Sequence, residues 1–319
     1  MDRIEMLRRH LSTAMDADID INTATSVHPS TQSRGLQLQQ TRTSTETTTP
    51  VRSDKRRGPE PNIPQRVRQC SSLVLDTPNQ PAAAAAAANA KWIPYLERCH
   101  VNCTPDAIVL IEPLAIRPET RKRFRRVVAS IGPQESYNVL DLHTGISNDV
   151  YLGDLAVGRW DEDRQNMYTS EIFEADTADA RTIHIGCDLF DAAGTPVCAF
   201  YDGEIFLTGH YPGAGDYGFV VVLKHVIDGR PVWSLHGHLQ PESVKNKKVG
   251  QKIAAGDVIG WIGCAHDDVN GGWVPHLHFQ LTLLQPRIAD WPGVVAPAHR
   301  ALAKQVYPDP RHVLGPLWQ

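Results

Sequence analysis

The chain has 319 residues, of which 21% are charged and 41% hydrophobic, and its formal net charge is −4. This composition is typical of a soluble globular protein, and the small negative charge argues against nucleic acid or an anionic membrane as the main partner. No run approaches the roughly 18 apolar residues that a membrane-spanning helix requires, so no membrane span is expected.

Residues 1–90 are predicted to form a disordered, low-complexity tail. The first residues carry several acidic side chains and no continuous apolar stretch, which argues against a secretory signal. Residues 22–65 are dominated by Thr, Ser, Gln, Arg and Pro, so they bury too little apolar surface to offset the entropy of ordering. The alanine run at 81–90 favours a helical linker. With no targeting signal visible, a cytoplasmic location is the default expectation.

Residues 91–175 are predicted to form a linker and a small α/β extension. The stretch "DAIVLIEPLAI" (106–116) is predicted to be a buried strand, and "RPETRKRFRRVVASI" (117–131) a helix with a basic, solvent-exposed face. The stretch "NVLDLHTG" (138–145) is predicted to be another short strand. The basic run is interpreted as a solvated surface, with binding of an acidic partner as the alternative.

The six cysteines of the chain are predicted to be free thiols, because no secretion signal is visible. The stretch "CHVNC" (99–103) has the spacing of half a zinc site, but no second pair of cysteines completes it. Cys187 is expected to be buried and not catalytic, since a cysteine nucleophile needs a paired base that the pattern does not supply.

From residue 176 to the end, the chain is predicted to form an antiparallel β-sheet or sandwich. Short apolar runs separated by Gly, Pro and Asp are typical of such folds. The runs are "RTIHIGCDLF" (181–190), "TPVCAFYDGEIFL" (195–207), "GFVVVLKHVI" (218–227), "VWSLHGHL" (232–239), "DVIGWIG" (257–263) and "HLHFQLTLL" (276–284).

Two of these runs carry histidines at alternate positions. Successive side chains of a strand point to opposite faces, so residues two apart share a face. The alternation therefore predicts that His276 and His278 share one face of their strand. By the same rule, His236 and His238 are expected to share a face of theirs.

A third run adds another group of polar residues that metals bind. His184 and Asp188 are four apart in "HIGCD", so an extended chain brings them to one side, and Gly186 between them leaves room for an ion or a substrate. One such group is weak support for a metal site, but three groups within about a hundred residues are much stronger. His and Asp bind zinc, and a catalytic zinc typically keeps three protein ligands and one open position. The surplus histidines suit acid–base or oxyanion-stabilising roles.

The order "HIGCD", "HGHL" and "HLH" resembles the lysostaphin/LytM-type zinc metalloendopeptidases, whose usual targets are peptidoglycan cross-bridges or stem peptides. The stretch "VGQKIAAGDVIGWIG" (249–263) also resembles the glycine-spaced hairpin of that family. The resemblance covers about residues 180–285. It implies a mainly β catalytic domain of the duplicated hybrid motif type over residues 176–319.

A narrower resemblance extends to about residues 138–315. It rests on "LGDLAVGRWDEDRQNMYTSEIF" (152–173), "GGWVPHLHFQL" (271–281), "DWPGVVAP" (290–297) and "YPDPRHVL" (307–314). These stretches are similar to a variant of the module that some bacterial proteins carry fused to a class III aminotransferase. The resemblance implies an aminotransferase as a possible partner.

The family resemblance implies a separate role for each residue of the motifs. His184, Asp188 and His278 correspond to the three Zn²⁺ ligands. His276 corresponds to a catalytic histidine that assists deprotonation of the attacking water, and His238 to one that stabilises the oxyanion.

The chain departs from the family pattern at His236, where many relatives have tyrosine. His236 is interpreted either as a neutral replacement or as a further polar group in the groove, which leaves the substrate preference open. The implied function is zinc-dependent hydrolysis of peptidoglycan cross-links or of peptides containing glycine or D-amino acids. The alternative is a non-catalytic metal-binding or regulatory module that partners an aminotransferase or kinase-like enzyme.

Overall fold

The structure is a computed structural model that describes residues 92–319, apart from 134, 144–154, 170, 176 and 178. The tail predicted over residues 1–90, including the alanine run at 81–90, therefore lies outside the described residues. Within the described part, no helix is long and apolar enough to cross a membrane.

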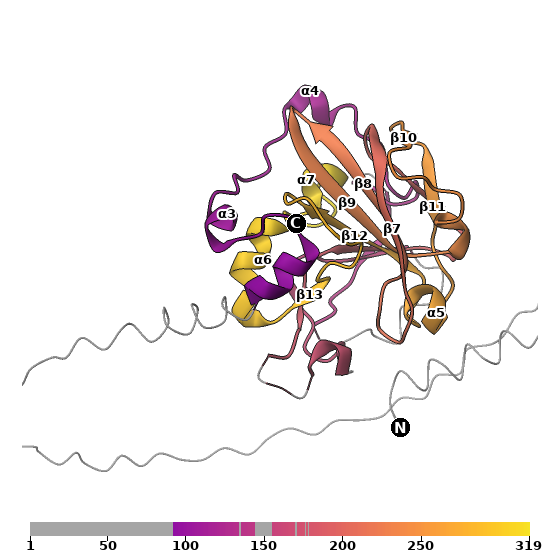
Figure 1. Cartoon of the computed structure of the whole chain (residues 1–319). Helices are drawn as coiled ribbons and strands as arrows, with labels where there is room; N and C mark the ends of the chain where they lie inside the picture. Colours follow the sequence, from indigo (N-terminus) through magenta and orange to yellow (C-terminus); the bar gives the residue numbers. More distant parts are fainter. Residues whose placement is uncertain (1–91, 134, 144–154, 170, 176, 178) are drawn as a thin grey trace, which may run out of the picture. The chain divides into compact units, whose positions relative to one another are not determined.

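An eight-stranded sheet forms the centre of the described part (Figure 1). All neighbouring strands in it run antiparallel except the first two, which are parallel. The expected mainly β fold with an antiparallel sheet is thus confirmed. The spatial order is β1 (Asn138–Val139), β2 (Ala156–Gly158), β5 (Cys187–Phe190), β12 (His276–Thr282), β9 (Arg230–Leu239), β8 (Gly218–Ile227), β7 (Gly203–Tyr211) and β10 (Lys252–Ile253).

Two smaller sheets complete the β structure. In one, β6 (Pro196–Cys198) pairs with β11 (Val258–Trp261). In the other, β4 (Ile183–His184) lies between β3 (Glu162–Asp163) and β13 (Val294–Val295). Every run of the β-rich region that was predicted to form strands contains at least one of these elements.

Both faces of the middle strands of the central sheet are buried, and strand alternation divides their side chains. On β8, Val221 belongs to one hydrophobic cluster, while Val220 and Val222 belong to another. On β12, Leu277 and Phe279 enter the first cluster, and each such side chain contributes about 1.5–3 kcal/mol when fully buried. The alternate residues of β12 are polar, and they face the second cluster, where the candidate site lies.

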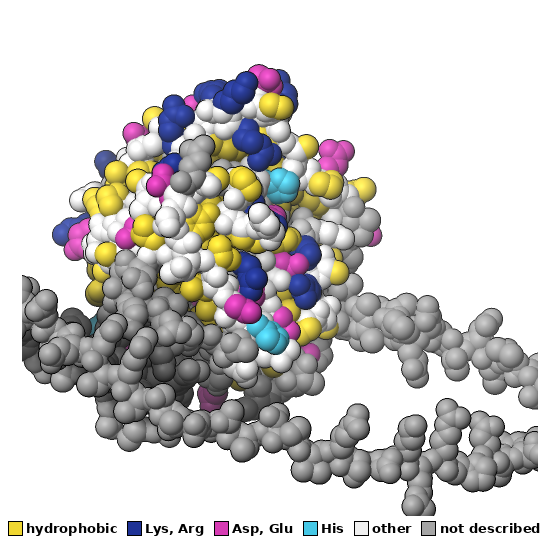
Figure 2. All heavy atoms as spheres, turned by 180° about the vertical axis from the view of Figure 1, so that it is seen from behind, with side chains coloured by type: hydrophobic (Ala, Val, Ile, Leu, Met, Phe, Trp, Pro, Cys, Tyr) yellow, Lys and Arg dark blue, Asp and Glu magenta, His cyan; other side chains and the backbone are white. Residues whose placement is uncertain are grey.

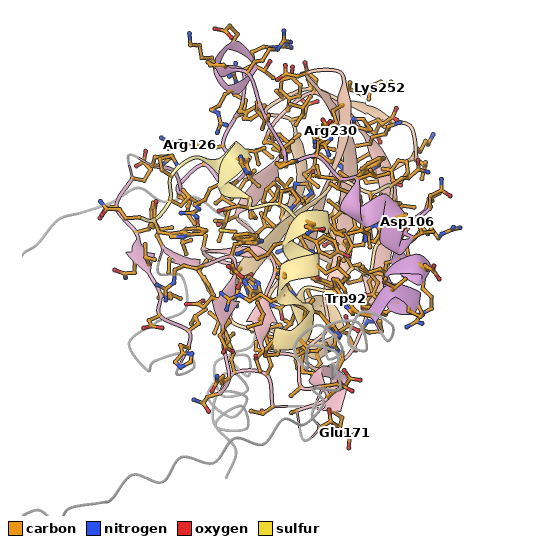
Figure 3. The ribbon with its side chains drawn as sticks, turned by 90° about the vertical axis from the view of Figure 1, so that its left-hand side faces the viewer. Trp92, Asp106, Arg126, Glu171, Arg230 and Lys252 are labelled. Carbon is orange, nitrogen blue, oxygen red and sulfur yellow. The ribbon has the colours of Figure 1, made fainter. Side chains whose placement is uncertain are left out.

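The helices are short and lie around the sheets (Figure 1). Residues 92–99 are helical, and Trp92 at their start is labelled in Figure 3. Its ring stacks on that of His299, the residue before helix α6 (Arg300–Val306), with 5.3 Å between ring centroids. The α-helices after residue 99 are α3 (Pro105–Val109), α4 (Pro118–Arg121), α5 (Asp267–Asn270), α6 (Arg300–Val306) and α7 (Arg311–Leu314). Single 3-10 turns are η1 (Glu171–Phe173), η2 (Pro241–Ser243) and η3 (Pro297–His299).

The strand predicted over residues 106–116 is wrong. The chain instead forms helix α3, which Thr104 caps by accepting a hydrogen bond from the Ala107 amide, and then continues without regular structure. A proline in the first turn suits a helix start because its missing N–H is not needed there. The apolar run was therefore a poor guide to secondary structure here, because the Thr104 cap and the proline at position 105 favour the start of a helix.

The helix predicted over residues 117–131 is wrong beyond Arg121, where α4 ends. After that point the backbone pairs with other segments, because the Arg125 amide donates to the Phe200 carbonyl at 2.8 Å and Val128 bridges Val197. Tertiary pairing thus overrides the helical propensity of the basic run.

Lys and Arg side chains gather at the end of the molecule that carries α4 (Figure 2). Several of them already have acidic partners in the fold. The ion pairs are Arg117–Asp228, Arg123–Asp202 and Arg126–Glu135. These contacts agree with the interpretation of the basic run as a solvated surface.

Candidate metal centre

Neighbouring strands place three possible metal ligands side by side. Asp188 on β5 lies directly opposite His278 on β12 in the antiparallel register. His184 ends β4, and the chain passes from it through only three residues before it reaches Asp188. The pairing of β5 with β12 therefore joins parts of the sequence that are 90 residues apart.

The ligand atoms of these three residues converge. Asp188 Oδ1 lies 3.2 Å from His184 Nε2 and 3.1 Å from His278 Nδ1, and the two ring nitrogens are 3.1 Å apart. Among the residues that the structure describes, these three form a group of possible metal ligands whose ligand atoms all lie within 4.8 Å of one another. Two imidazole nitrogens and one carboxylate oxygen form a donor set that suits a catalytic zinc with an open position.

A hydrogen bond from the other ring nitrogen orients each of the two candidate histidine ligands. His184 Nδ1 lies 2.9 Å from the Arg159 carbonyl oxygen, and His278 Nε2 lies 3.0 Å from Gln280 Oε1. If both nitrogens donate in these contacts, His184 Nε2 and His278 Nδ1 carry the lone pairs that a metal needs.

The charge states of the group also suit metal binding. Burial, reinforced by the charge of Arg164, lowers the pKa of His184 to about 4, so its ring is neutral at neutral pH. Burial opposes ionisation of Asp188, but the neighbouring charge of Arg164 holds the pKa of this carboxyl well below its usual value. A neutral imidazole and an ionised carboxylate are the forms that bind metal.

The two histidines predicted to be catalytic lie beside this group. His276 Nδ1 is 2.7 Å from the Val274 carbonyl oxygen, and its Nε2 is 3.8 Å from Asp188 Oδ1. The ring of His238 is 4.4 Å from that of His276, measured between centroids, and its Nδ1 is buried without a hydrogen-bond partner among the described residues. Burial lowers the pKa of both rings, so both are neutral at neutral pH.

The prediction that His236 shares a face with His238 is wrong. His238 has a positive φ of 60°, and the pairing of β8 with β9 is irregular between Phe219 and Val221. His236 lies opposite Phe279 of the hydrophobic core, and its Nδ1 is 3.1 Å from the Val221 carbonyl oxygen. His236 therefore belongs to the core and is not a polar group of the groove.

Gly186 has a different use from the one expected. A Cβ atom at this position would overlap with the imidazole ring of His278. The missing side chain thus makes room for the ring of His278, and not directly for an ion or a substrate.

A pocket with a cavity volume of about 140 Å³ opens in front of the group. A water molecule occupies about 30 Å³ in the liquid, so the cavity has room for several. All five residues predicted for the site line it: His184, Asp188, His238, His276 and His278. Aromatic side chains form much of the remaining wall: Tyr95, Tyr168, Phe173, Tyr217, Trp273 and Trp291.

Three contributors to the site were missed from the sequence: Gln280, Arg164 and the Arg159 carbonyl. Gln280 follows His278 by two residues on the same strand, so alternation was sufficient to place it on the same face. Arg164 and Arg159 lie in an irregular segment, where no periodic pattern indicates which side chains turn inward.

This part of the chain is similar to known proteins. Residues 182–288 match the family model described as Peptidase family M23. The glycyl-glycine endopeptidase ALE-1 of Staphylococcus capitis is 38% identical over 100 residues, which are 30% of this chain and 24% of that protein. The peptidoglycan DD-endopeptidase ShyA of Vibrio cholerae is 37% identical over 100 residues, 31% of this chain and 20% of that protein. The chain thus spans less than a quarter of the length of either relative.

Among solved structures, the catalytic domain of lysostaphin from Staphylococcus simulans is 28% identical. The match covers 36% of this chain and 77% of that chain with a TM-score of 0.27. At this TM-score the structural likeness adds nothing to the family match.

Proposed function

Because residues 182–288 match peptidase family M23, we propose that the chain is a zinc-dependent metalloendopeptidase. The observation that carries the proposal is the convergence of His184, Asp188 and His278 within 4.8 Å, at a pocket that two further histidines line. Three protein ligands with additional neutral histidines suit metal-assisted hydrolysis better than purely structural metal binding, which usually uses four protein ligands.

The proposed substrates are peptidoglycan cross-links or peptides that contain glycine or D-amino acids. Support comes from the names of two relatives, a glycyl-glycine endopeptidase and a peptidoglycan DD-endopeptidase. Both share with this chain the segment that carries the candidate site.

Each residue of the site has a proposed part in the reaction. A zinc ion held by His184, Asp188 and His278 would polarise the scissile carbonyl and make the attacking water more acidic. His276 accepts the proton of that water on Nε2, because its Nδ1 is engaged by the Val274 carbonyl. His238 stabilises the charge that develops on the carbonyl oxygen, because its ring lines the pocket 4.4 Å from that of His276, measured between centroids.

The test combines metal analysis with hydrolysis of purified peptidoglycan and of a peptide library. The wild-type protein is expected to retain zinc and to cleave at least one substrate. His278→Ala is expected to lose zinc and activity together, since it removes a ligand. His276→Ala is expected to keep zinc and to lose about 10²–10⁴-fold in rate, the usual contribution of a general base.

His312→Ala is the matched control, because His312 does not line the pocket. Zinc binding by His278→Ala at the wild-type level would show that the ligand assignment is wrong. A zinc-loaded wild type that cleaves no substrate would favour the alternative, a non-catalytic module that partners an aminotransferase or kinase-like enzyme.

A further inference from the structure

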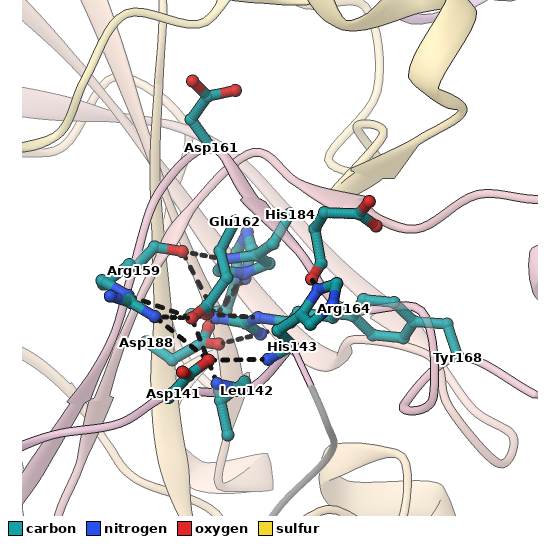
Figure 4. Close-up of polar contacts among 12 residues, drawn as sticks. Asp141, Leu142, His143, Arg159, Asp161, Glu162, Arg164, Tyr168, His184 and Asp188 are labelled. Carbon is teal, nitrogen blue, oxygen red and sulfur yellow. Dashed lines mark hydrogen bonds and ion pairs between the residues drawn. The ribbon is translucent and has the colours of Figure 1, made fainter. Parts of the chain in front are cut away.

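Arg164 lies beside Asp188 and His184 of the candidate metal centre and lines the same pocket, in a segment that precedes the family match (Figure 4). Its side chain is only 1% exposed. Removing a guanidinium from water is costly unless its hydrogen bonds and its charge are matched. The partners of Arg164 therefore indicate why this position carries a charge.

Arg164 joins two carboxylates. Its Nη1 lies 2.7 Å from Asp188 Oδ2, and its Nε lies 3.0 Å from Glu162 Oε2. Nη1 also donates to the Tyr168 hydroxyl at 3.0 Å, and Nη2 to the Arg159 carbonyl at 3.4 Å. The guanidinium is thus held on several sides, and its orientation is fixed.

The two oxygens of Asp188 have different partners. Oδ1 faces the ligating nitrogens of His184 and His278 at 3.2 and 3.1 Å. Oδ2 is turned to Arg164. A guanidinium that holds the second oxygen of a carboxylate disfavours bidentate ligation and leaves the first oxygen as the one presented to a metal.

The neighbouring backbone is shaped to admit this ion pair. Gly158 on β2 lies opposite Asp188 on β5. A Cβ at Gly158 would lie 2.7 Å from Arg164 Nη2 and 3.1 Å from Asp188 Oδ2. The absence of a side chain at this point leaves space for the guanidinium and the carboxylate to meet.

We propose that Arg164 is a positioning residue that restricts Asp188 to ligation through one oxygen and so keeps a coordination position open for water and substrate. The inference rests on the proposed zinc site. It also means that the residues before the family match complete the centre, because Arg164 holds Asp188 and the Arg159 carbonyl orients His184.

The test is Arg164→Lys, measured by zinc affinity in a chelator competition and by the visible spectrum of the Co²⁺-substituted protein. Lysine keeps the charge but lacks the planar fork that can hold Glu162 and Asp188 together. Release of Asp188 Oδ2 is expected to add a ligand atom to the metal, which weakens the visible Co²⁺ absorption. Zinc affinity is expected to fall about 10–100-fold, the usual effect of losing an outer-shell partner.

Arg300→Lys is the matched control. The Arg300 side chain pairs at 2.6 Å with Asp161, which lies in the same segment as Arg164, but Arg300 does not line the pocket. Its Co²⁺ spectrum and zinc affinity are expected to equal those of the wild type. An equal change in both variants would assign the effect to a general loss of stability and overturn the role of Arg164.

Other outcomes separate this inference from the proposed function. If the wild type binds metal and Arg164→Lys has the same zinc affinity and Co²⁺ spectrum, the inference alone is overturned. If the wild type takes up neither Zn²⁺ nor Co²⁺, both the inference and the proposed function are overturned. If Arg164→Lys fails to fold, Gly158→Ala is measured in its place, because the added Cβ shifts the guanidinium of Arg164 without removing it. The same spectral change in Gly158→Ala supports the inference, and a wild-type spectrum overturns it.

Discussion

His238 reaches the metal centre because its backbone departs from regular strand geometry. A positive φ is uncommon outside glycine, and such residues cluster at functional sites. With φ at 60°, His238 leaves the face that alternation assigns to it and joins His276 and His278. The spacing of His276 and His278 was a valid guide because β12 is regular, whereas no sequence pattern indicated the irregularity at His238.

His236→Leu is predicted to leave hydrolysis unchanged, because His236 faces the core. Burial lowers the pKa of His236 to about 3, and its Nε2 has no hydrogen-bond partner among the described residues. The leucine loses one hydrogen bond but also removes an unsatisfied buried nitrogen, so the free energy of unfolding should change by no more than about 1.5 kcal/mol. Urea denaturation and a steady-state assay measure the two effects. A changed substrate preference would contradict this prediction and indicate that His236 is a polar group of the groove.

At the scale of elements, most strands after residue 180 were predictable because they lie in apolar runs bounded by turn residues, and only the two-residue strands β10 and β13 fall outside those runs. Among the earlier strands, β1 lies within the stretch 138–145 that was predicted to be a strand. The other two, β2 with three residues and β3 with two, were not predicted. They exist because β2 pairs with β5 and β3 pairs with β4. Such pairing is a tertiary interaction, which local sequence does not encode. The five residues of the candidate site could nevertheless be predicted, because the order of the histidine motifs indicated them. The contact of Arg164 with Asp188 could not, because Arg164 lies in this unpredicted segment.

Asp161 connects this segment to helix α6, and Asp161→Asn is predicted to weaken the connection. Its carboxylate lies 2.6 Å from Arg300 Nε and 2.5 Å from Lys304 Nζ. Burial alone would raise the pKa of Asp161, but Arg300 and Lys304 outweigh it and lower the pKa. Both partners are partly exposed, so the loss in free energy of unfolding should be only about 1 kcal/mol. Asparagine also tolerates the positive φ of 61° at this position.

Denaturation of the Asp161→Asn protein at low and high salt checks this prediction. The difference from the wild type should shrink at about 1 M salt, where exposed charges are screened. Arg123→Gln is the control, because the Arg123–Asp202 partners are 61% and 54% exposed and their pair should contribute less. An equal loss in both variants would contradict a special role for Asp161.

At the scale of the whole molecule, buried histidines make stability depend on pH. Burial lowers the pKa of His100, His184 and His225 to about 4, against 6.5 for an unperturbed histidine. Between pH 6.5 and 4 the unfolded chain therefore binds protons that the folded chain does not. The free energy of unfolding is expected to fall as the pH falls through this range, by about 1.4 kcal/mol per pH unit for each histidine.

Denaturation between pH 4.5 and 7.5, with a chelator present, measures this slope. His225→Gln is expected to reduce the slope by the share of one histidine, since His225 is fully buried and lies outside the metal centre. Asp290 works in the opposite direction, because burial raises its pKa to about 6 and the folded chain then holds a proton that the unfolded chain releases. A slope that is the same in wild type and His225→Gln would contradict the prediction.

The pairing of β2 with β5 has a consequence for where the chain can be cut. The family match begins at residue 182, but β5 has β2 on one side and β12 on the other. A fragment that starts at the family boundary would turn β5 from an interior strand into an open edge. Exposed edges offer unpaired N–H and C=O groups to other chains and promote aggregation. The boundary of sequence similarity therefore falls inside a hydrogen-bonded sheet, so it is a poor place to divide the protein.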